Sequence, residues 1–305
     1  MNNHKELVLG IFGFGVVGEG LYKVLNQTPS LKATIKKVCI KNSSKPRSAP
    51  AELFTIDKYI LLNDPDINVI VELIDDADAA YDIVFTALIN GKNVVSANKK
   101  MIADHLPELL KLQKQTGCSF LYEAACCASI PVIRNLEEYY DNDLLHSMSA
   151  VINGSTNFIL TKMFEDKVSF KTALLEAQQS GFAESNPTLD VNGYDALNKW
   201  TFLLTHAYGI IPKPGQLAFT GIQHINSEDA AIAEKKDSVI KLVAHAKKLK
   251  NGKVAAFVLP QFVKKDDMLA FIKNEYNGVI IESAFADKQF FYGKGAGSFP
   301  TASAV

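Results

Sequence analysis

The sequence predicts an α/β protein in two parts, a parallel sheet with crossover helices followed by an α+β part with a mixed sheet. In the first part, short apolar segments such as Leu7–Phe12 and Val69–Ile74 alternate with segments of helical spacing, which is typical of βαβ units. Farther along, the segments Ser238–Lys250, Val254–Phe262 and Gly278–Ala286 alternate helix and strand in a way that suits a mixed sheet. These patterns indicate two domains.

The remaining elements follow from the same periodicities of apolar residues. We expect further strands at Ile35–Ile40, Asn93–Ser96, Ser119–Leu121 and Ser147–Ile152, and helices at Gly20–Leu25, about Ala79–Asn90 and most of 162–209. The last helix carries an apolar stripe over Trp200–Ala207, so His206 is expected to be a core histidine with its hydrogen bonds satisfied.

The composition describes a globular chain and narrows its partners. The chain has 305 residues, 48% of them hydrophobic and 21% charged, with a formal net charge of -1. Acidic and basic residues are interspersed, so nucleic acid or an anionic membrane would meet no extended basic patch. No apolar run reaches the length of a membrane span, and Met1–Glu6 leads into a strand without a signal-peptide pattern. We therefore expect a cytoplasmic protein that binds small molecules.

The four cysteines give no sign of a metal or disulfide framework. Cys39, Cys118, Cys126 and Cys127 lack the spacing of metal ligands. The adjacent pair Cys126-Cys127 could close only a strained ring. Reduced, structural thiols are the expectation.

The first strand leads into a glycine-rich turn that is typical of dinucleotide-binding domains. The turn reads Gly13-Phe14-Gly15-Val16-Val17-Gly18 and is followed by a helical pattern. Glycine lets the backbone turn tightly and approach a pyrophosphate, whose charge is held by unpaired N–H groups at the helix start. Strand, turn and helix together predict a Rossmann-type domain in which Gly13, Gly15, Val16, Val17 and Gly18 contact the cofactor. A tight turn without a ligand is the alternative.

The residues after the second strand discriminate between NAD and NADP. An acidic residue there would accept a hydrogen bond from the ribose 2′-hydroxyl of NAD and would repel the additional phosphate of NADP. The chain instead carries Asn42 among Lys41, Lys45 and Arg47, which could bind that phosphate. We expect NADP as the preferred cofactor, with NAD as the alternative, unless this is an ordinary basic surface loop.

The segment Ala177–Lys199 concentrates four charges around turn-forming residues. Its Asn-Pro and Asn-Gly pairs are turn signals, so Glu184 and Asp190 should lie on a folded loop. Asp195 and Lys199 open an apolar helix and lie one turn apart on the same face. Carboxylates beside an ammonium can hold a substrate amino group while the lysine reaches an oxygen that gains or loses a proton. A solvated salt bridge is the alternative for any single pair.

This segment resembles the signature of homoserine dehydrogenases. The resemblance spans 23 positions and rests on one small residue, three glycine or proline positions, two aspartates and a lysine at fixed spacings, namely Ala177, Gly181, Pro187, Gly193, Asp190, Asp195 and Lys199. Similarity to the family extends over nearly the whole chain. It implies reduction of L-aspartate 4-semialdehyde to L-homoserine with NAD(P)H, as in threonine, methionine and isoleucine biosynthesis.

The resemblance also implies roles for the charged residues. Glu184 and Asp190 would hold the substrate amino group, Asp195 would orient a lysine, and Lys199 would give a proton to the carbonyl oxygen as hydride arrives. Lys99, in an Asn-Lys-Lys segment similar to the family's, would bind substrate and share the proton transfer. Whether Lys199 itself or a water that it holds is the acid stays open.

Other contacts are implied by the same family. The stretch Asn153-Gly154-Ser155-Thr156-Asn157 is similar to one that lines the substrate pocket, which implies substrate contacts for Asn153, Gly154 and Thr156. Such residues also cap helices well. Ser96, Lys99 and Gly297 would contact the cofactor, Gly297 from a closing glycine loop.

The resemblance further implies a cation, domain limits and an assembly. A sodium ion would be bound by Glu123 and by backbone oxygens of Cys126, Ala128 and Ile130, because hard oxygen ligands suit a hard cation. Residues 1–130, rejoined by 289–305, would form the dinucleotide-binding domain, and residues 131–288 the substrate-binding and dimerisation domain. A homodimer is expected.

Two departures from the family keep alternatives open. Asp75-Asp76 replaces a pair of glycines, and these carboxylates would either repel the cofactor phosphates or point to solvent. The sequence stops at Val305, where the family begins a helix that packs on the first domain, so we expect that helix to be missing, together with any C-terminal regulatory domain. The alternatives are another NAD(P)-dependent amino-acid dehydrogenase and a cofactor-binding protein without catalysis.

Overall fold

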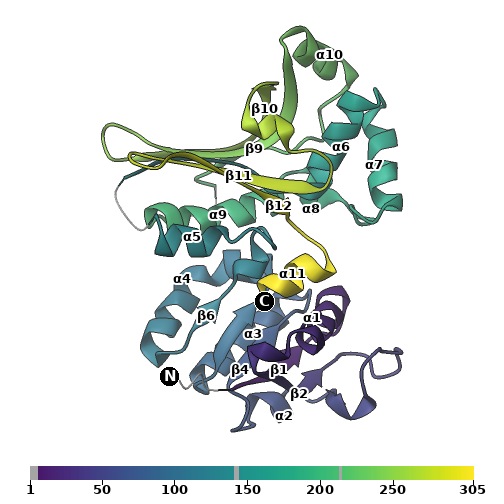
Figure 1. Cartoon of the computed structure of the whole chain (residues 1–305), viewed down its shortest axis with the longest axis vertical. Coiled ribbons are helices and arrows are strands. Elements are labelled where there is room, and N and C mark those ends of the chain that lie inside the picture. The colour runs from purple at the N-terminus through teal and green to yellow at the C-terminus, as the bar shows by residue number, and fades with distance from the viewer. Residues whose placement is uncertain (1–5, 141–143, 213–214) are drawn as a thin grey trace. The chain divides into compact units, whose positions relative to one another are not determined.

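The computed structural model describes residues 6–140, 144–212 and 215–305. The chain divides into two compact units, a first unit of Met1–Ser129 with Ala296–Val305 and a second unit of Ile130–Gly295. Each unit is built around its own six-stranded sheet (Figure 1). Among the described residues, no helix is both long enough and apolar enough to cross a membrane.

The sheet of the first unit is entirely parallel and has the strand order β3-β2-β1-β4-β5-β6. Its strands are β1 (Leu7–Phe12), β2 (Ala33–Cys39), β3 (Phe54–Thr55), β4 (Val69–Glu72), β5 (Asn93–Ser96) and β6 (Phe120–Leu121). The order reverses between β1 and β4, and ligands of such sheets bind where this happens, at the carboxyl ends of the strands. The predicted Rossmann-type domain is confirmed.

Helices cover this sheet because its central strands are apolar on both faces. Ile11, Ile70 and Val71 are buried, as is typical of strands in parallel sheets. The helices and short 3-10 turns of the unit are α1 (Val16–Gln27), η1 (Pro29–Leu31), η2 (Ala51–Leu53), α2 (Tyr59–Leu62), α3 (Ala77–Ile89), α4 (Lys99–Thr116), η3 (Glu123–Ala125) and α11 (Ser298–Ala304).

Helix α11 returns the end of the chain to the first unit, where it contacts α1 (Figure 1). Ala302 is buried in the same apolar cluster as Leu21 of α1. Ser298 Oγ donates to the Val16 carbonyl at 2.7 Å. A Cβ added at Gly20 would lie 2.5 Å from Ser298 Oγ, so glycine permits this close approach. The expectation that a helix is missing here is therefore wrong for residues 298–304, which are helical.

The sheet of the second unit is mixed, in the order β12-β11-β7-β9-β10-β8. Its strands are β7 (Leu145–Val151), β8 (Ala218–Phe219), β9 (Ser238–Lys248), β10 (Val254–Lys264), β11 (Tyr276–Ser283) and β12 (Asp287–Lys294). All neighbours are antiparallel except β8, which runs parallel to β10. The predicted mixed sheet is confirmed.

The expected alternation of helix and strand across 238–286 is wrong in detail, because all three segments are strands. β9 and β10 pair over their full lengths, from Ser238 opposite Lys264 to Lys248 opposite Val254. The β-branched residues of β9 favour a strand, and this non-local pairing outweighs any local preference of its lysines for a helix. Helical residues lie between the strands only at η4 (Met268–Phe271).

Helices of the second unit place the charged segment beside this sheet. They are α5 (Val132–Glu138), α6 (Gly154–Glu165), α7 (Phe170–Gln179), α8 (Thr188–Val191), α9 (Tyr194–Tyr208) and α10 (Ser227–Lys235). α9 contacts α5, β9 and β10, and buries Trp200 and Phe202 completely. His206 Nδ1 lies 2.8 Å from Glu137 Oε1, so this histidine is a partnered core residue as expected.

Candidate active site

The glycine turn after β1 is open to a ligand. Gly13 has φ +96°, and a Cβ there would lie 2.7 Å from the Leu73 carbonyl oxygen, so only glycine fits. A Cβ at Gly18 would lie 2.5 Å from the Gly13 oxygen. At Gly15 no heavy atom of the described chain lies within 4 Å of the Cβ position. Val16 and Val17 then begin α1. The first N–H groups of a helix have no carbonyl acceptor within the helix, so they can bind an anion.

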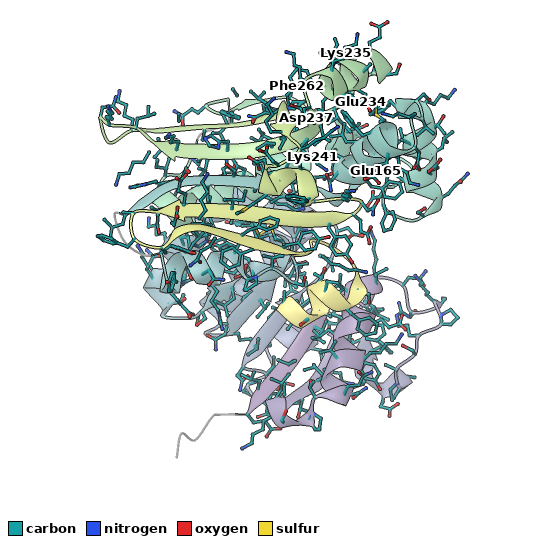
Figure 2. The ribbon with its side chains drawn as sticks, turned by 45° about the horizontal axis from the view of Figure 1, so that its top comes forward. Glu165, Glu234, Lys235, Asp237, Lys241 and Phe262 are labelled. Carbon is teal, nitrogen blue, oxygen red and sulfur yellow. The ribbon has the colours of Figure 1, made fainter. Side chains whose placement is uncertain are left out.

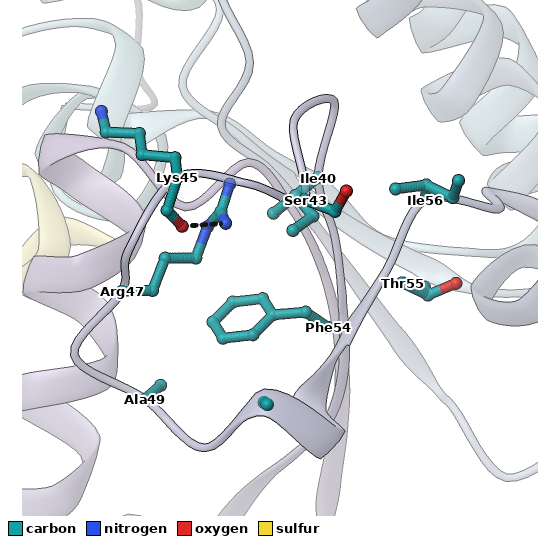
Figure 3. Close-up of a pocket in the computed structure, with 9 residues that line it drawn as sticks. Ile40, Ser43, Lys45, Arg47, Ala49, Phe54, Thr55 and Ile56 are labelled. Carbon is teal, nitrogen blue, oxygen red and sulfur yellow. Dashed lines mark hydrogen bonds between the residues drawn. The ribbon is translucent and has the colours of Figure 1, made fainter.

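Two of the three predicted basic residues line a pocket of about 460 Å³ between β2 and β3 (Figure 3). Lys45 and Arg47 share this lining with Ser43, and the Arg47 guanidinium lies 5.2 Å from the centre of the Phe54 ring. Arg47 Nη1 also donates to the Lys45 carbonyl at 2.6 Å, which holds the loop around it. Lys41 is exposed and lies outside the lining. The pocket therefore offers two cations and an aromatic face.

Gly297 and Lys99 lie at the starts of helices in the first unit. Gly297 has φ +116° and precedes α11, whose first residue contacts Val16 of the glycine turn. Lys99 is the half-buried first residue of α4. Asn98 caps this helix, because its Oδ1 accepts from the Met101 N–H at 2.9 Å.

Asp75 and Asp76, at the positions where the resemblance implies glycines, are both exposed on the loop after β4. Asp76 is the N-cap of α3, and its Oδ1 accepts from the Ala79 N–H at 3.0 Å. A carboxylate at this position stabilises the helix start through both the hydrogen bond and the helix dipole. At least one of the two substitutions thus has a local structural role.

A buried acid at the end of β4 was not anticipated from the sequence. Glu72 is fully buried, and its two carboxylate oxygens accept from the Ile74 N–H at 2.7 Å and from Ser96 Oγ at 2.6 Å. Burial raises the pKa of Glu72 to about 7, the nearby charge of Asp75 adds to this, and the two hydrogen bonds oppose it. The Ser96 hydroxyl, predicted to contact the cofactor, is therefore engaged with Glu72. The sequence signal that could have indicated this buried acid is its position, because Glu72 ends the apolar strand Val69–Glu72.

In the second unit, the predicted charges of α8 and α9 gather around one asparagine. Lys199 Nζ lies 2.8 Å from Asp195 Oδ2 and donates to the Ile152 carbonyl, also at 2.8 Å. Asn153 Nδ2 donates to Asp190 Oδ1 at 2.7 Å and to Asp195 Oδ2 at 2.9 Å. The lysine is only 5% exposed, so this is a buried polar network and not a solvated salt bridge.

Local structure explains why Asn153 can hold both carboxylates. It is the N-cap of α6, where its Oδ1 accepts from the Thr156 N–H at 2.8 Å, which leaves its amide nitrogen directed at the carboxylates. Thr156 Oγ1 donates back to the Asn153 carbonyl at 3.1 Å. A Cβ at Gly154 would lie 2.6 Å from the Glu275 carbonyl oxygen, so glycine allows this segment to pack on the helix start.

Two carboxylates, Asp190 and Asp195, accept from the same Asn153 amide, and Asp195 also pairs with the Lys199 ammonium. Burial raises the pKa of Asp190, the neighbouring Asp195 raises it further, and the hydrogen bond from Asn153 opposes both. An additional cation, such as the ammonium of an amino acid, would relieve the repulsion between the two carboxylates. Glu184 is not part of this network: its side chain is exposed, and its carbonyl accepts from Gln178 at 2.9 Å.

The segment predicted to bind sodium forms a tight turn after β6. Glu123 is half-buried at the start of η3, and Ala128 has φ +43°. The carbonyl of Ile130 accepts from the Val132 N–H at 2.8 Å. The two thiols of Cys126 and Cys127 lie 3.6 Å apart and are both reduced. Across the described ranges, no group of three or more His, Cys, Asp or Glu residues could hold a metal ion, which leaves carbonyl oxygens and one carboxylate as the donor set.

Comparison with known proteins identifies the family of this chain. A family model described as homoserine dehydrogenase matches residues 131–305, and one described as the homoserine dehydrogenase NAD binding domain matches residues 13–123. Homoserine dehydrogenase of Bacillus subtilis is 34% identical over 99% of this chain and 71% of its own length. That of Synechocystis is 36% identical over 97% of this chain and 71% of its own length.

Solved structures show the same fold. A homoserine dehydrogenase from Thiobacillus denitrificans superposes with a TM-score of 0.92 at 33% identity, covering 98% of this chain and 71% of that one. A hyperthermophilic archaeal homoserine dehydrogenase in complex with NADPH has a TM-score of 0.82 at 26% identity, covering 98% of this chain and 95% of that one. The chain thus belongs to the homoserine dehydrogenase family, oxidoreductases that act on a CH–OH group with a nicotinamide cofactor.

Proposed function

We propose that this protein is an NADP-dependent homoserine dehydrogenase that reduces L-aspartate 4-semialdehyde to L-homoserine in threonine, methionine and isoleucine biosynthesis. The observation that carries the choice of cofactor is the pocket lined by Lys45 and Arg47 beside β2. A 2′-phosphate would meet two cations there, and the loop 41–47 contains no carboxylate to repel it. The complex of an archaeal relative with NADPH supports the same choice.

Two further features of the first unit would hold the nucleotide. The glycine turn at Gly13 would hold the pyrophosphate against the start of α1. The Phe54 ring beside Arg47 offers an apolar face for the adenine end. When bound, the nicotinamide supplies the hydride that is added to the aldehyde carbon.

The residues around Asn153 would bind the substrate and manage its proton. Asp190 and Asp195 would accept hydrogen bonds from the substrate ammonium, because both are held in place by Asn153. Lys199 would give a proton to the carbonyl oxygen as the hydride reaches the carbon, which turns the aldehyde into the alcohol. Asp195 keeps the Lys199 ammonium in position at 2.8 Å. A water held by Lys199 is the alternative donor.

Further substrate contacts are proposed for residues on neighbouring segments. Gly154 and Thr156 belong to the first turn of α6, next to the network. Glu184 lies on the exposed loop that leads to α8, where it is open to an entering substrate. Lys99, at the start of α4, would bind the substrate as well.

The direct test follows NADPH formation by absorbance with homoserine, running NADP and NAD side by side. Lys199→Ala should abolish turnover, whereas Lys171→Ala, which removes an exposed lysine of α7, should leave it unchanged. Circular dichroism checks that both variants fold. Turnover near the wild-type rate in folded Lys199→Ala would refute its role, and a preference for NAD would refute the choice of cofactor.

We also propose a sodium ion, a homodimer and the domain limits implied by the family. Sodium would be held by Glu123 and by the carbonyls of Cys126, Ala128 and Ile130; the positive φ of Ala128 supports a turn with clustered carbonyls. The limit at 130/131 is close to the change between compact units at 129/130, whereas the limit at 288/289 falls inside β12, which belongs to the second unit up to residue 295. Activity measured with and without sodium would test the ion. Light scattering would test the homodimer, for which we propose a cytoplasmic location.

A further inference from the structure

Four residues at the ends of β4 and β5 form a closed ring of hydrogen bonds. Glu72 accepts from the Ile74 N–H at 2.7 Å and from Ser96 Oγ at 2.6 Å. Ser96 Oγ in turn accepts from the Asn98 N–H at 3.1 Å, and Asn98 Nδ2 donates to the Ile74 carbonyl at 3.0 Å. Both backbone groups of Ile74 are therefore held, one by each side of the ring. These hydrogen bonds hold the loops that follow β4 and β5 against each other.

The position of this ring in the sheet relates it to one end of the cofactor. The basic pocket lies on the β2–β3 side and the glycine turn follows β1. A dinucleotide crosses such a sheet at the point where the strand order reverses, so its other half extends to the β4–β5 side. The adenosine belongs to the basic pocket, which leaves the nicotinamide to the side that carries the ring of Glu72. The glycine turn also approaches the end of β4, because the Cβ position of Gly13 lies 2.7 Å from the Leu73 carbonyl oxygen.

Glu72 is the buried ionisable group of this ring, and its charge can change near neutral pH. Burial raises its pKa to about 7, against the two hydrogen bonds that favour the anion. The neighbouring elements carry these charges: β1 and β5 carry none, the loop after β4 carries Asp75 and Asp76, α3 on β4 carries Asp78 and Asp82, and α4 begins with Lys99 and Lys100. Of these, Asp75 acts on Glu72 and raises its pKa.

We propose that Glu72 is a positioning residue whose buried carboxylate makes the protein prefer the oxidised nicotinamide over the reduced one. The oxidised ring carries a positive charge and the reduced ring is neutral, so a buried anion at this end of the sheet stabilises the oxidised form selectively. The ring of hydrogen bonds holds the carboxylate and both loops in place. This inference rests on the proposed use of NADP by the first unit.

Linkage gives the sign of the effect. An ionised Glu72 strengthens binding of NADP⁺, and bound NADP⁺ must lower the pKa of Glu72 by the same free energy. The affinity for NADP⁺ relative to NADPH should therefore increase as pH rises through the pKa of Glu72. A coupling of about one pKa unit corresponds to an about ten-fold change in that ratio.

The test measures dissociation constants for NADP⁺ and NADPH by calorimetry, without turnover, between about pH 5.5 and about pH 8.5, a range centred on the pKa of about 7. Using their ratio cancels the ionisation of the 2′-phosphate, which both forms share. In the wild type the ratio should shift towards NADP⁺ by about ten-fold as pH rises. In Glu72→Gln it should stay constant, because glutamine can accept from the Ile74 N–H and donate to Ser96 without a charge.

Two further variants separate the charge of Glu72 from its surroundings. Ser96→Ala removes a hydrogen bond that lowers the pKa of Glu72, so the midpoint of the ratio shift should move to higher pH. Asp75→Asn should retain the shift with its midpoint at lower pH. A wild-type ratio independent of pH, or a shift that survives in Glu72→Gln, would overturn the inference. If neither form binds, the proposed cofactor is wrong and the inference falls with it; pH-independent binding of both forms overturns the inference alone.

Discussion

Replacing Lys241 with Met should remove a pH-dependent penalty from the stability of the second unit. Lys241 lies in β9 and is only 3% exposed. Its Nζ donates to Asn157 Oδ1 at 2.8 Å and to the Ile272 carbonyl, two uncharged acceptors. Figure 2 labels Lys241 together with Glu165, which ends α6. Burial lowers the pKa of Lys241 to about 8, with Lys273 adding to the effect and Glu165 opposing it.

The magnitude follows from the two pKa values. The unfolded chain protonates this lysine with a pKa of 10.5, and the folded chain with one of about 8. Between these values the unfolded state binds more protons, so the free energy of unfolding rises with pH, whereas below about pH 8 the full penalty is present. The difference is worth about 3 kcal/mol in all, of which about 2 kcal/mol should be regained between about pH 7 and about pH 9.5.

Urea denaturation across this pH range measures the effect. The free energy of unfolding of the wild type, minus that of Lys241→Met, should rise with pH by about 2 kcal/mol, because other titrating groups cancel in the difference. Lys247→Met, at an exposed lysine of the same strand, is the matched control and should show no such rise relative to the wild type. Equal pH slopes for the wild type and Lys241→Met would show that Lys241 is not a buried cation in the folded protein.

Three further substitutions test the rest of the structure. Arg47→Ala should weaken NADPH binding by about ten-fold or more while leaving NADH almost unchanged, since a hydrogen bond to a charged group contributes about 2 kcal/mol; calorimetry with both cofactors measures this, and equal losses would contradict it. Asn153→Ala should lower kcat/KM for homoserine and also destabilise the protein by about 1 kcal/mol through the lost cap of α6; steady-state kinetics with a melting curve would detect either, and unchanged kinetics would exclude its role. Gly20→Ala should lower Tm, because its Cβ would lie 2.5 Å from Ser298 Oγ; an unchanged Tm would show that α11 can move away.

Much of the first unit was predictable because its signals are local. The strand Leu7–Phe12, the glycine turn and the start of α1 follow one another without interruption, and each depends on backbone preferences of neighbouring residues. The spacing of Asp195 and Lys199 likewise predicted that they share one face of a helix, because residues four apart lie one turn from each other, and in the structure the two side chains are paired. The family itself could be recognised from the order of residues between Ala177 and Lys199.

The sequence by itself therefore determined the Rossmann-type domain, the mixed sheet and the family, all of which depend on periodicity or on short ordered patterns. Only the tertiary structure decided that 238–248 is a strand, because β10 pairs with it from farther along the chain. It likewise placed Asp190 in the polar network around Asn153 while leaving Glu184, six residues earlier, exposed. Glu72 and Lys241 became buried charges for the same reason: burial and the pKa shifts it causes depend on neighbours that are distant in sequence.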